Sequence, residues 1–428
     1  MSDVIISSFA VTGAVSPPPS KSEAHRALIA AALAGEGTIQ DLPQSADIEA
    51  TRRAVSGLGV CVEDIREGVS LSRRIPSLAG EVEVDCGECG TTLRLILPVY
   101  AALGIPARFT GSGRLPQRPL SVYQELLPRH GVTLQTEPEA GAGDCLPLRL
   151  SGRLTGGEYC LPGDISSQFV SGLLLALPLC REDSVIRLTS PLESAGYVRM
   201  TLEAMRRAGV QVETEKDGWR IPGGQVYRPF RYTVEGDWSQ AAFLLAAGIV
   251  GGELIVPGLN TASFQGDREI LDLLRAFGAD ISVDRAGIRC RKAPLCGITI
   301  DASQIPDLVP VLAAVASLAQ GRTYILGAAR LRLKESDRLA AMARGLNALG
   351  AEVEERPDGL IVYGKPRLTG GTASACNDHR VAMSLAVAAL GCREPVTIVG
   401  ADCVSKSWPL FFHDFIRMGG EGHVFQRG

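Results

Sequence analysis

The sequence lacks the features of a secreted, membrane-bound or nucleic-acid-binding protein. Residues 1–10 contain neither a basic stretch nor a long apolar run, so they do not resemble a signal peptide. The apolar runs, such as 308–319, are shorter than the ~20 residues that cross a bilayer. The formal net charge is −4, whereas surfaces that bind nucleic acids or membranes are usually basic. We therefore expect a cytoplasmic protein with no nucleic-acid or membrane partner.

The sequence also offers few metal ligands at metal-binding spacing. Cys86 and Cys89 form a CxxC pair among 11 cysteines. A zinc site normally needs a second such pair or nearby histidines, and none of the five histidines is near this pair in the sequence. Cysteines in a long intracellular chain are usually reduced and buried. We therefore predict no metal, no redox role for the pair, and no cofactor.

A nucleotide-binding phosphate loop is excluded by one residue. The segment 359–365 fits the first seven positions of such a loop, but Pro366 stands where a hydroxyl side chain binds the metal. We expect a strand and a turn there instead.

The chain has ample apolar sequence and an internal repeat. Its 428 residues are 46% hydrophobic and 21% charged, which is typical of a globular protein of two or three domains. Helical patterns stop at a glycine six times, roughly 70 residues apart. Glycine ends helices there because it adopts the left-handed conformation without strain. The six stops are Gly59, Gly131, Gly209, Gly278, Gly350 and Gly419.

A second series runs in step with the first. A small, polar or charged residue precedes an apolar helical run six times, at Ser20, Gly90, Ser166, Asp237, Asp307 and Asn377. Each repeat therefore has one apolar helix, one amphipathic helix and several short strands. Because a helix that is apolar all round is normally buried, we predict an α/β (α+β) fold. It has two similar domains, each with three helices packed inside a shell of strands and outer helices.

Basic residues recur near the starts of the apolar helices. Lys21, Arg26, Arg94 and Arg380 lie there, beside Ser22. Each alone reads as an ordinary capping or surface residue. Because a helix N-terminus carries partial positive charge, a basic side chain there is unfavourable unless an anion lies between them. The recurrence therefore predicts small substrates with several phosphate or carboxylate groups.

Six short motifs, in order, resemble those of the 5-enolpyruvylshikimate-3-phosphate synthase family. They are Pro19-Ser20-Lys21-Ser22, Gly90-Thr91-Thr92-Leu93-Arg94, Arg118-Pro119, Ser166-Ser167-Gln168, Leu333-Lys334-Glu335-Ser336-Asp337-Arg338 and Asn377-Asp378-His379-Arg380. The resemblance covers nearly the whole chain. It implies two domains, 18–232 and 1–17 with 233–428, each an inside-out α/β barrel of three βαβαββ-type repeats, with the active site in the cleft between them.

The resemblance also implies a reaction of the shikimate pathway to chorismate and the aromatic amino acids. The 5-hydroxyl of shikimate 3-phosphate attacks C2 of phosphoenolpyruvate while C3 is protonated, and the tetrahedral intermediate then loses a C3 proton and phosphate. By position, Asp307 corresponds to the base for the hydroxyl. Glu335 corresponds to the group that exchanges protons with the methylene. Lys21 corresponds to a residue that contacts both substrates.

The binding residues follow from the same correspondence. For shikimate 3-phosphate they are Lys21, Ser22, Arg26, Ser166, Ser167, Gln168, Ser194, Tyr197, Asp307, Arg330 and Lys334. For phosphoenolpyruvate they are Lys21, Gly90, Arg94, Arg118, Gln168, Arg338, Arg380 and Lys406. From the residues alone, Glu335 would be interpreted as a member of a helical ion-pair ladder.

For the oligomeric state, we expect a monomer.

Three positions depart from the family pattern. Glu88 and Arg330 each stand where Asn is frequent, and Leu95 follows Arg94 where Pro is common. Gly90 leaves room beside the phosphoenolpyruvate pocket, as in members that the inhibitor glyphosate blocks. The residue at position 95 affects the position of the helix that carries Gly90. Because this residue is Leu, we expect glyphosate to bind less tightly than in typical sensitive members.

Two other functions fit parts of the pattern. One is the sister enolpyruvyl transferase acting on UDP-N-acetylglucosamine, but residues 109–120 lack the reactive Cys of that family and Ser22 replaces its Asn. The other is a non-catalytic protein that binds phosphometabolites, which retention of both Asp307 and Glu335 disfavours.

Overall fold

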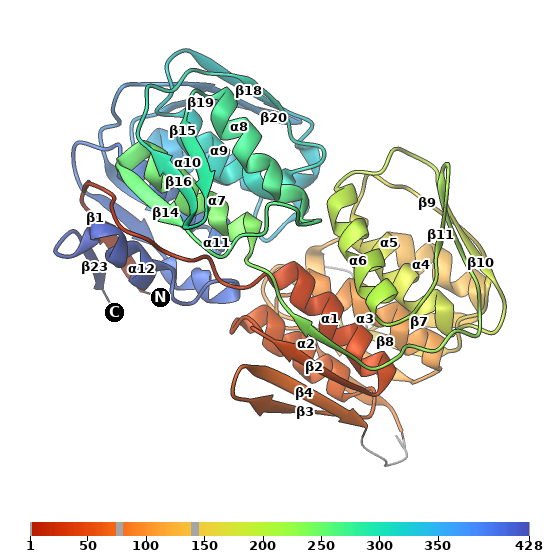
Figure 1. Cartoon of the computed structure of the whole chain (residues 1–428). Helices are drawn as coiled ribbons and strands as arrows, with labels where there is room; N and C mark the ends of the chain where they lie inside the picture. Colours follow the sequence, from red (N-terminus) through yellow and green to blue (C-terminus); the bar gives the residue numbers. More distant parts are fainter. Residues whose placement is uncertain (1, 74–79, 138–144, 428) are drawn as a thin grey trace. The chain divides into compact units, whose positions relative to one another are not determined.

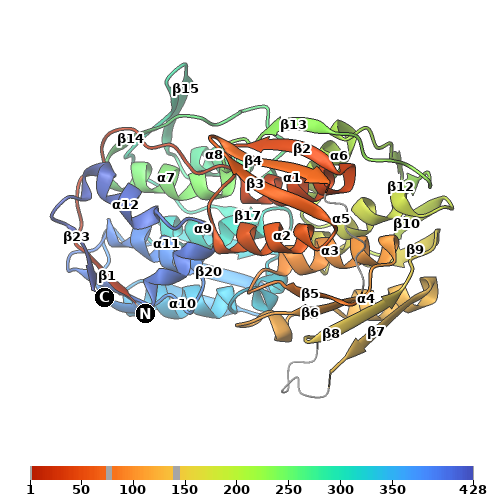
Figure 2. The same ribbon diagram turned by 90° about the horizontal axis from the view of Figure 1, so that it is seen from below.

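The computed structural model describes residues 2–73, 80–137 and 145–427. The chain forms two compact units. Unit 1 comprises Met1–Ser20 and Glu235–Gly428, and unit 2 comprises Lys21–Val234. Figures 1 and 2 show that each unit combines helices with several small sheets.

Within the described residues there are six sheets, three in each unit. The sheets of unit 2 share one pattern, in which a parallel pair of strands is followed by two antiparallel neighbours. Their orders are β13 (Phe230–Thr233), β2 (Glu36–Gln40), β4 (Gly68–Arg73), β3 (Val60–Ile65); β5 (Val82–Asp85), β6 (Ala107–Thr110), β8 (Leu148–Gly152), β7 (Val132–Thr136); and β9 (Gly157–Leu161), β10 (Ser184–Leu188), β12 (Gly218–Ile221), β11 (Glu213–Glu215).

Two sheets of unit 1 repeat this pattern. Their orders are β17 (Thr299–Asp301), β18 (Arg322–Leu326), β20 (Gly359–Tyr363), β19 (Glu352–Arg356); and β21 (Gly371–Ser374), β22 (Val396–Val399), β1 (Asp3–Ile6), β23 (Val424–Arg427). The third sheet has β14 (Glu253–Val256), β16 (Gly287–Arg291) and β15 (Asp280–Asp284). Parallel bridges from Val11 and Ala14 extend it. The strand expected at 359–365 is confirmed as β20.

Six helices form the inside of the two units. They are α1 (Lys21–Ala34), α3 (Gly90–Leu103) and α5 (Ser167–Ala176) in unit 2, and α7 (Trp238–Gly251), α9 (Val309–Ala316) and α11 (His379–Ala389) in unit 1. Every residue of α9 and α11 is buried, and the two helices pack on each other and on α7. Because these helices bury all faces, their sequences are apolar all round. The predicted α/β fold with buried helices is confirmed.

A second set of helices follows the first strand of each repeat. It comprises α2 (Ala46–Ser56), α4 (Ser121–Leu126), α6 (Ala195–Arg207), α8 (Ile270–Ala276), α10 (Arg338–Ala348) and α12 (Phe411–Phe415). The glycines predicted to stop them all have left-handed φ values between 77° and 103°. Some predicted helices are shorter than expected. The α4 segment continues as a 3-10 turn, Leu127–His130, because Pro128 cannot donate the backbone hydrogen bond of an α-helix.

Each unit has its own hydrophobic core, built largely from its three inner helices and the inward-facing strand residues. Among the described residues, the structure has no helix of the length and apolar character needed to cross a membrane.

Candidate active site

The N-terminal turns of the three inner helices of unit 2 meet one another. The Gln168 side chain, at the start of α5, donates to Thr91 Oγ1 at 2.8 Å and accepts from Arg94 at 2.9 Å, both in the first turns of α3. Arg26 of α1 donates to Ser171 Oγ of α5 at 3.5 Å. Partial positive charge from three helix ends therefore gathers at one place in this unit.

Gly90 and Arg118 fit against each other at this place. A Cβ atom added to Gly90 would lie 2.7 Å from the Arg118 guanidinium carbon, closer than van der Waals contact allows. Arg94 lies beside them, 5% exposed, and donates to the Pro119 carbonyl oxygen at 2.8 Å. The structure thus brings together three residues that the resemblance assigns to phosphoenolpyruvate.

Lys21 opens α1 and pairs with an acidic residue of α2. Its Nζ lies 2.6 Å from Asp47 Oδ2, and both side chains keep partial access to solvent. A lysine held in this way has a fixed position and still has N–H groups directed elsewhere. Asp47 has no place in the sequence prediction, although its position in the first turn of a helix is a usual one for a carboxylate.

Arg26 is almost completely buried, with 2% of its surface exposed. Its Nε donates to Thr201 Oγ1 at 2.7 Å, and one terminal nitrogen donates to the Ser22 carbonyl oxygen at 2.7 Å. Its guanidinium lies over the Tyr197 ring. Burial lowers the pKa of Arg26 to about 10. Arg26 therefore ties α1 to α5 and α6 and holds Ser22 and Tyr197 in position.

The remaining predicted residues of unit 2 stand at helix starts. Ser166 caps α5 by accepting from the Gln168 backbone N–H at 3.3 Å, and Ser167 is buried next to it. Ser194 precedes α6 in a left-handed conformation, with φ of 54°. Left-handed backbone is unfavourable for serine, and such geometry is common at functional sites.

In unit 1, one buried arginine binds three carboxylates. Arg338, the first residue of α10, is 2% exposed. Its nitrogens lie 2.8 Å from Asp307 Oδ1, 2.6 Å from Glu335 Oε2 and 2.8 Å from Asp378 Oδ2. Burial opposes the charge of Arg338, but the carboxylates of Asp378, Glu335 and Asp307 outweigh burial and raise its pKa. The two residues predicted to transfer protons thus share one guanidinium.

Other basic residues of unit 1 surround Asp307. Arg380 donates to the Asp307 carbonyl oxygen at 3.0 Å and lies 3.4 Å from Asp307 Oδ2. Lys334 Nζ lies 3.8 Å from Asp307 Oδ1. Burial lowers the pKa of Lys334 to about 8, although Asp307 partly opposes this shift. These contacts bring the start of α11 and the segment before α10 to the turn that begins α9.

Two predicted basic residues lie at the edges of this group. Lys406 donates to the Asn377 carbonyl oxygen at 2.7 Å. Arg330 donates to the carbonyl oxygen of Ser303. A backbone oxygen therefore holds each of these two side chains in position.

Two acidic residues of this site have no place in the sequence prediction. Asp378 is fully buried, caps α11 through the Arg380 backbone N–H and accepts from Ser336 and Arg338. The signal was its place inside the motif 377–380. Asp267 is buried near Asp307, and burial together with Asp307 raises its pKa to about 6. Its proximity arises only from folding, so no spacing in the sequence indicates it.

Folding brings a histidine close to the CxxC pair, although none is near it in the sequence. His25 Nε2 lies 3.9 Å from Cys89 Sγ, because α1 and α3 pack side by side. Cys86 and Cys89 are both free thiols.

The family model for EPSP synthase (3-phosphoshikimate 1-carboxyvinyltransferase) matches residues 7–415. The chain belongs to the EPSP synthase family. The 3-phosphoshikimate 1-carboxyvinyltransferase of Clostridium acetobutylicum is 44% identical over 433 aligned residues, covering all of both chains. That of Clostridium kluyveri is 44% identical over 98% of each chain. A solved EPSP synthase from Acinetobacter baumannii superposes over the whole of both chains with a TM-score of 0.81 and 26% identity.

The family decides between the functions considered from the sequence. The relatives are named for transfer to 3-phosphoshikimate, and the motif residues cited above are all present. The chain is an enolpyruvyl transferase of this family and has its two-unit α/β fold.

Proposed function

We propose that the residues gathered in the two units act together on shikimate 3-phosphate and phosphoenolpyruvate. As a member of the EPSP synthase family, the chain transfers the carboxyvinyl group of phosphoenolpyruvate to shikimate 3-phosphate in the shikimate pathway. The new C–O bond forms at the substrate 5-hydroxyl, and phosphate leaves in the second step. Both substrates are multiply anionic, which fits basic side chains at converging helix N-termini.

The observation that carries the assignment of roles is the Arg338 bridge. Its positive charge stabilises the negative charge that Asp307 carries before the addition and that Glu335 acquires once it has delivered its proton to C3. We assign to Asp307 the proton of the attacking hydroxyl. Glu335 exchanges the proton at C3 of phosphoenolpyruvate, because addition and elimination need a proton delivered and then removed there. Lys21 contacts both substrates and stabilises the charge that develops between them.

The substrate-binding residues complete the proposal. Shikimate 3-phosphate contacts Lys21, Ser22, Arg26, Ser166, Ser167, Gln168, Ser194, Tyr197, Asp307, Arg330 and Lys334. Phosphoenolpyruvate contacts Lys21, Gly90, Arg94, Arg118, Gln168, Arg338, Arg380 and Lys406. Fixed arginines and lysines neutralise phosphate and carboxylate groups directly. The cytoplasmic location and the monomeric state stay predictions from the sequence.

A phosphate-release assay tests the function. The purified chain is given phosphoenolpyruvate with shikimate 3-phosphate, and separately with UDP-N-acetylglucosamine. We expect phosphate release and a carboxyvinyl product only with shikimate 3-phosphate. Release only with the nucleotide sugar contradicts the proposal, and no release with either supports a non-catalytic binding protein.

Replacement of Gly90 by alanine is expected to raise the KM for phosphoenolpyruvate by about 10- to 100-fold, since displacement of a substrate-positioning group by less than 1 Å has effects of this size. The added methyl group displaces the Arg118 guanidinium, which lies 2.7 Å from the new Cβ position. The KM for shikimate 3-phosphate serves as the internal control and is expected to change little. An unchanged KM for phosphoenolpyruvate would show that Arg118 does not bind this substrate.

Lys334 is expected to give shikimate 3-phosphate binding a pH dependence above neutrality. With a pKa of about 8, Lys334 is protonated below that pH and loses its charge above it. The KM for shikimate 3-phosphate should therefore rise as pH passes through 8, in the range where the substrate phosphate is already fully ionised. Lys334→Arg keeps its charge throughout this range, so its KM should show no such rise. The same rise in this variant contradicts the assignment.

Glyphosate is expected to compete with phosphoenolpyruvate but to bind less tightly than in typical sensitive members. Gly90 leaves space for the inhibitor, whereas Leu95 is fully buried in α3 and bears on the position of that helix. Inhibition kinetics at several phosphoenolpyruvate concentrations provide the measurement, and Leu95→Pro is the comparison variant. Ordinary tight inhibition, or none, overturns this expectation.

A further inference from the structure

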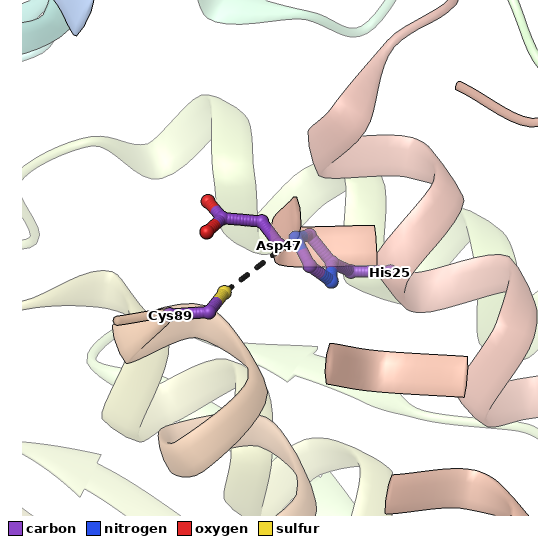
Figure 3. A group of neighbouring side chains, drawn as sticks. All are labelled: His25, Asp47 and Cys89. Carbon is purple, nitrogen blue, oxygen red and sulfur yellow. Dashed lines mark hydrogen bonds between the residues drawn. The ribbon is translucent and has the colours of Figure 1, made fainter. Parts of the chain in front are cut away.

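Three side chains of metal-binding type meet in unit 2, and none is among the residues assigned to substrates. They are His25 in α1, Asp47 in α2 and Cys89 before α3 (Figure 3). One donor atom of each, a ring nitrogen, a carboxylate oxygen and Sγ, lies within 4.8 Å of the other two. The donor set of nitrogen, oxygen and sulfur is one that zinc accepts.

The imidazole of His25 is oriented for a ligand. Its Nδ1 lies 2.6 Å from Thr51 Oγ1, and Thr51 Oγ1 lies 2.7 Å from Thr92 Oγ1. When Nδ1 carries the proton and donates it to Thr51, Nε2 directs its lone pair towards Cys89 Sγ at 3.9 Å. A hydrogen bond at the second ring nitrogen is the usual support of a metal-binding histidine. Burial lowers the pKa of His25 well below its usual value, which keeps the ring neutral.

Cys89 is positioned to hold negative charge when it loses its proton. It is the N-cap of α3, and its Sγ accepts from the Thr92 backbone N–H at 3.3 Å. The helix N-terminus favours a thiolate. Burial nevertheless raises the pKa of Cys89 to about 12, so the thiol stays protonated without a cation. A cation bound at Sγ has to displace this proton, and Sγ then lies within reach of the donor atoms of His25 and Asp47.

We propose that His25, Asp47 and Cys89 form an inhibitory site for a thiophilic divalent cation of the zinc type. On binding, the S–H proton of Cys89 leaves to solvent and a metal–sulfur bond forms, with no change of oxidation state. Asp47 supplies the third ligand on the side that retains solvent access, since its side chain is 11% exposed.

Inhibition follows from the second partner of Asp47. The same carboxylate lies 2.6 Å from Lys21 Nζ. A cation that takes this carboxylate competes with Lys21 for its charge and repels the ammonium group. Lys21 is then no longer held at its position, and turnover falls. This part of the inference rests on the role proposed above for Lys21, whereas metal binding itself does not.

Binding is tested on the reduced, metal-free full chain. Zinc is titrated by calorimetry, and cadmium by the ultraviolet charge-transfer band of its bond to a thiolate. Cys89→Ser keeps a favourable N-cap for α3 but removes the sulfur ligand, and His25→Gln removes the nitrogen ligand. Cys160→Ser, which removes an exposed thiol, is the control. We expect both site variants to lose about tenfold or more in affinity, with Cys160→Ser unchanged.

Activity is measured in parallel as the ratio of rates with and without zinc. The ratio should fall for the wild type and for Cys160→Ser, and should stay near unity for Cys89→Ser. Absence of a saturable site, or equal affinity in Cys89→Ser, overturns the site. Binding through Cys89 without loss of rate overturns the inhibition. A chain that is inactive even without metal contradicts the proposed function instead, and calorimetry still decides the site.

Discussion

Replacing Glu335 by glutamine is expected to lower kcat by about 10²- to 10⁴-fold, the usual contribution of a group that transfers a proton in the transition state. Glutamine keeps the shape and retains a hydrogen-bond acceptor, but its amide cannot accept and return a proton at C3 of phosphoenolpyruvate. Arg338 keeps its ion pairs with Asp307 and Asp378 in this variant. The dissociation constant of shikimate 3-phosphate should therefore change little while kcat falls.

Glu355 provides a matched control for this substitution. It also pairs with an arginine, Arg332, at 2.6 Å, but its side chain is 38% exposed. Glu355→Gln should leave kcat unchanged. A second readout separates chemistry from structure: exchange of the methylene protons of phosphoenolpyruvate with deuterated solvent should slow in Glu335→Gln. If kcat stays within tenfold of the wild type, Glu335 is not the group that moves this proton.

Replacing Arg338 by methionine is expected to lower the free energy of unfolding by about 3–5 kcal/mol, the usual effect of removing one partner of a buried ion pair. The substitution removes the guanidinium that the fully buried Asp378 shares with two further carboxylates, Asp307 and Glu335. Urea titration followed by circular dichroism gives the measurement.

Two further variants separate charge from packing in this experiment. Adding Asp378→Asn to Arg338→Met should restore part of the stability, because asparagine removes the uncompensated charge and still caps α11. Arg332→Met removes an arginine whose ion pairs with Asp337 and Glu355 are partly exposed; it should cost less than about 1 kcal/mol. Equal losses in Arg338→Met and Arg332→Met contradict the view that the buried carboxylates need Arg338.

Much of the fold follows from local signals in the sequence. The six glycine stops are predictable because left-handed backbone is a property of a single residue, and all six have positive φ. The inner helices are predictable because burial on every side demands apolar residues throughout. The order of strands in the sheets is not predictable from local sequence, since β1 pairs with β22 and β23, which lie almost a whole chain length away. No local pattern specifies such pairing.

The residues of the candidate site likewise fall into those that the sequence predicts and those that only the fold reveals. Basic residues at helix starts are visible in the sequence because their phase in the repeat is constant. Asp47 and Asp267 are not visible in this way, because each acts through a partner that folding brings close, whereas Asp378 lies within one of the motifs. The nearness of His25 to Cys89 also arises only from folding, since linear spacing gives no sign of it.

The insertion of unit 2 between β1 and the rest of unit 1 has a consequence for synthesis on the ribosome. Lys21–Val234 is continuous, so this unit is able to fold while later residues are still being added. Unit 1 is not continuous, because β1 lies between β22 and β23, which are translated after the whole of unit 2. The backbone groups of β1 must therefore wait for their partner strands until β22 and β23 have been made. Truncation before β22 would therefore leave β1 without either of its neighbouring strands.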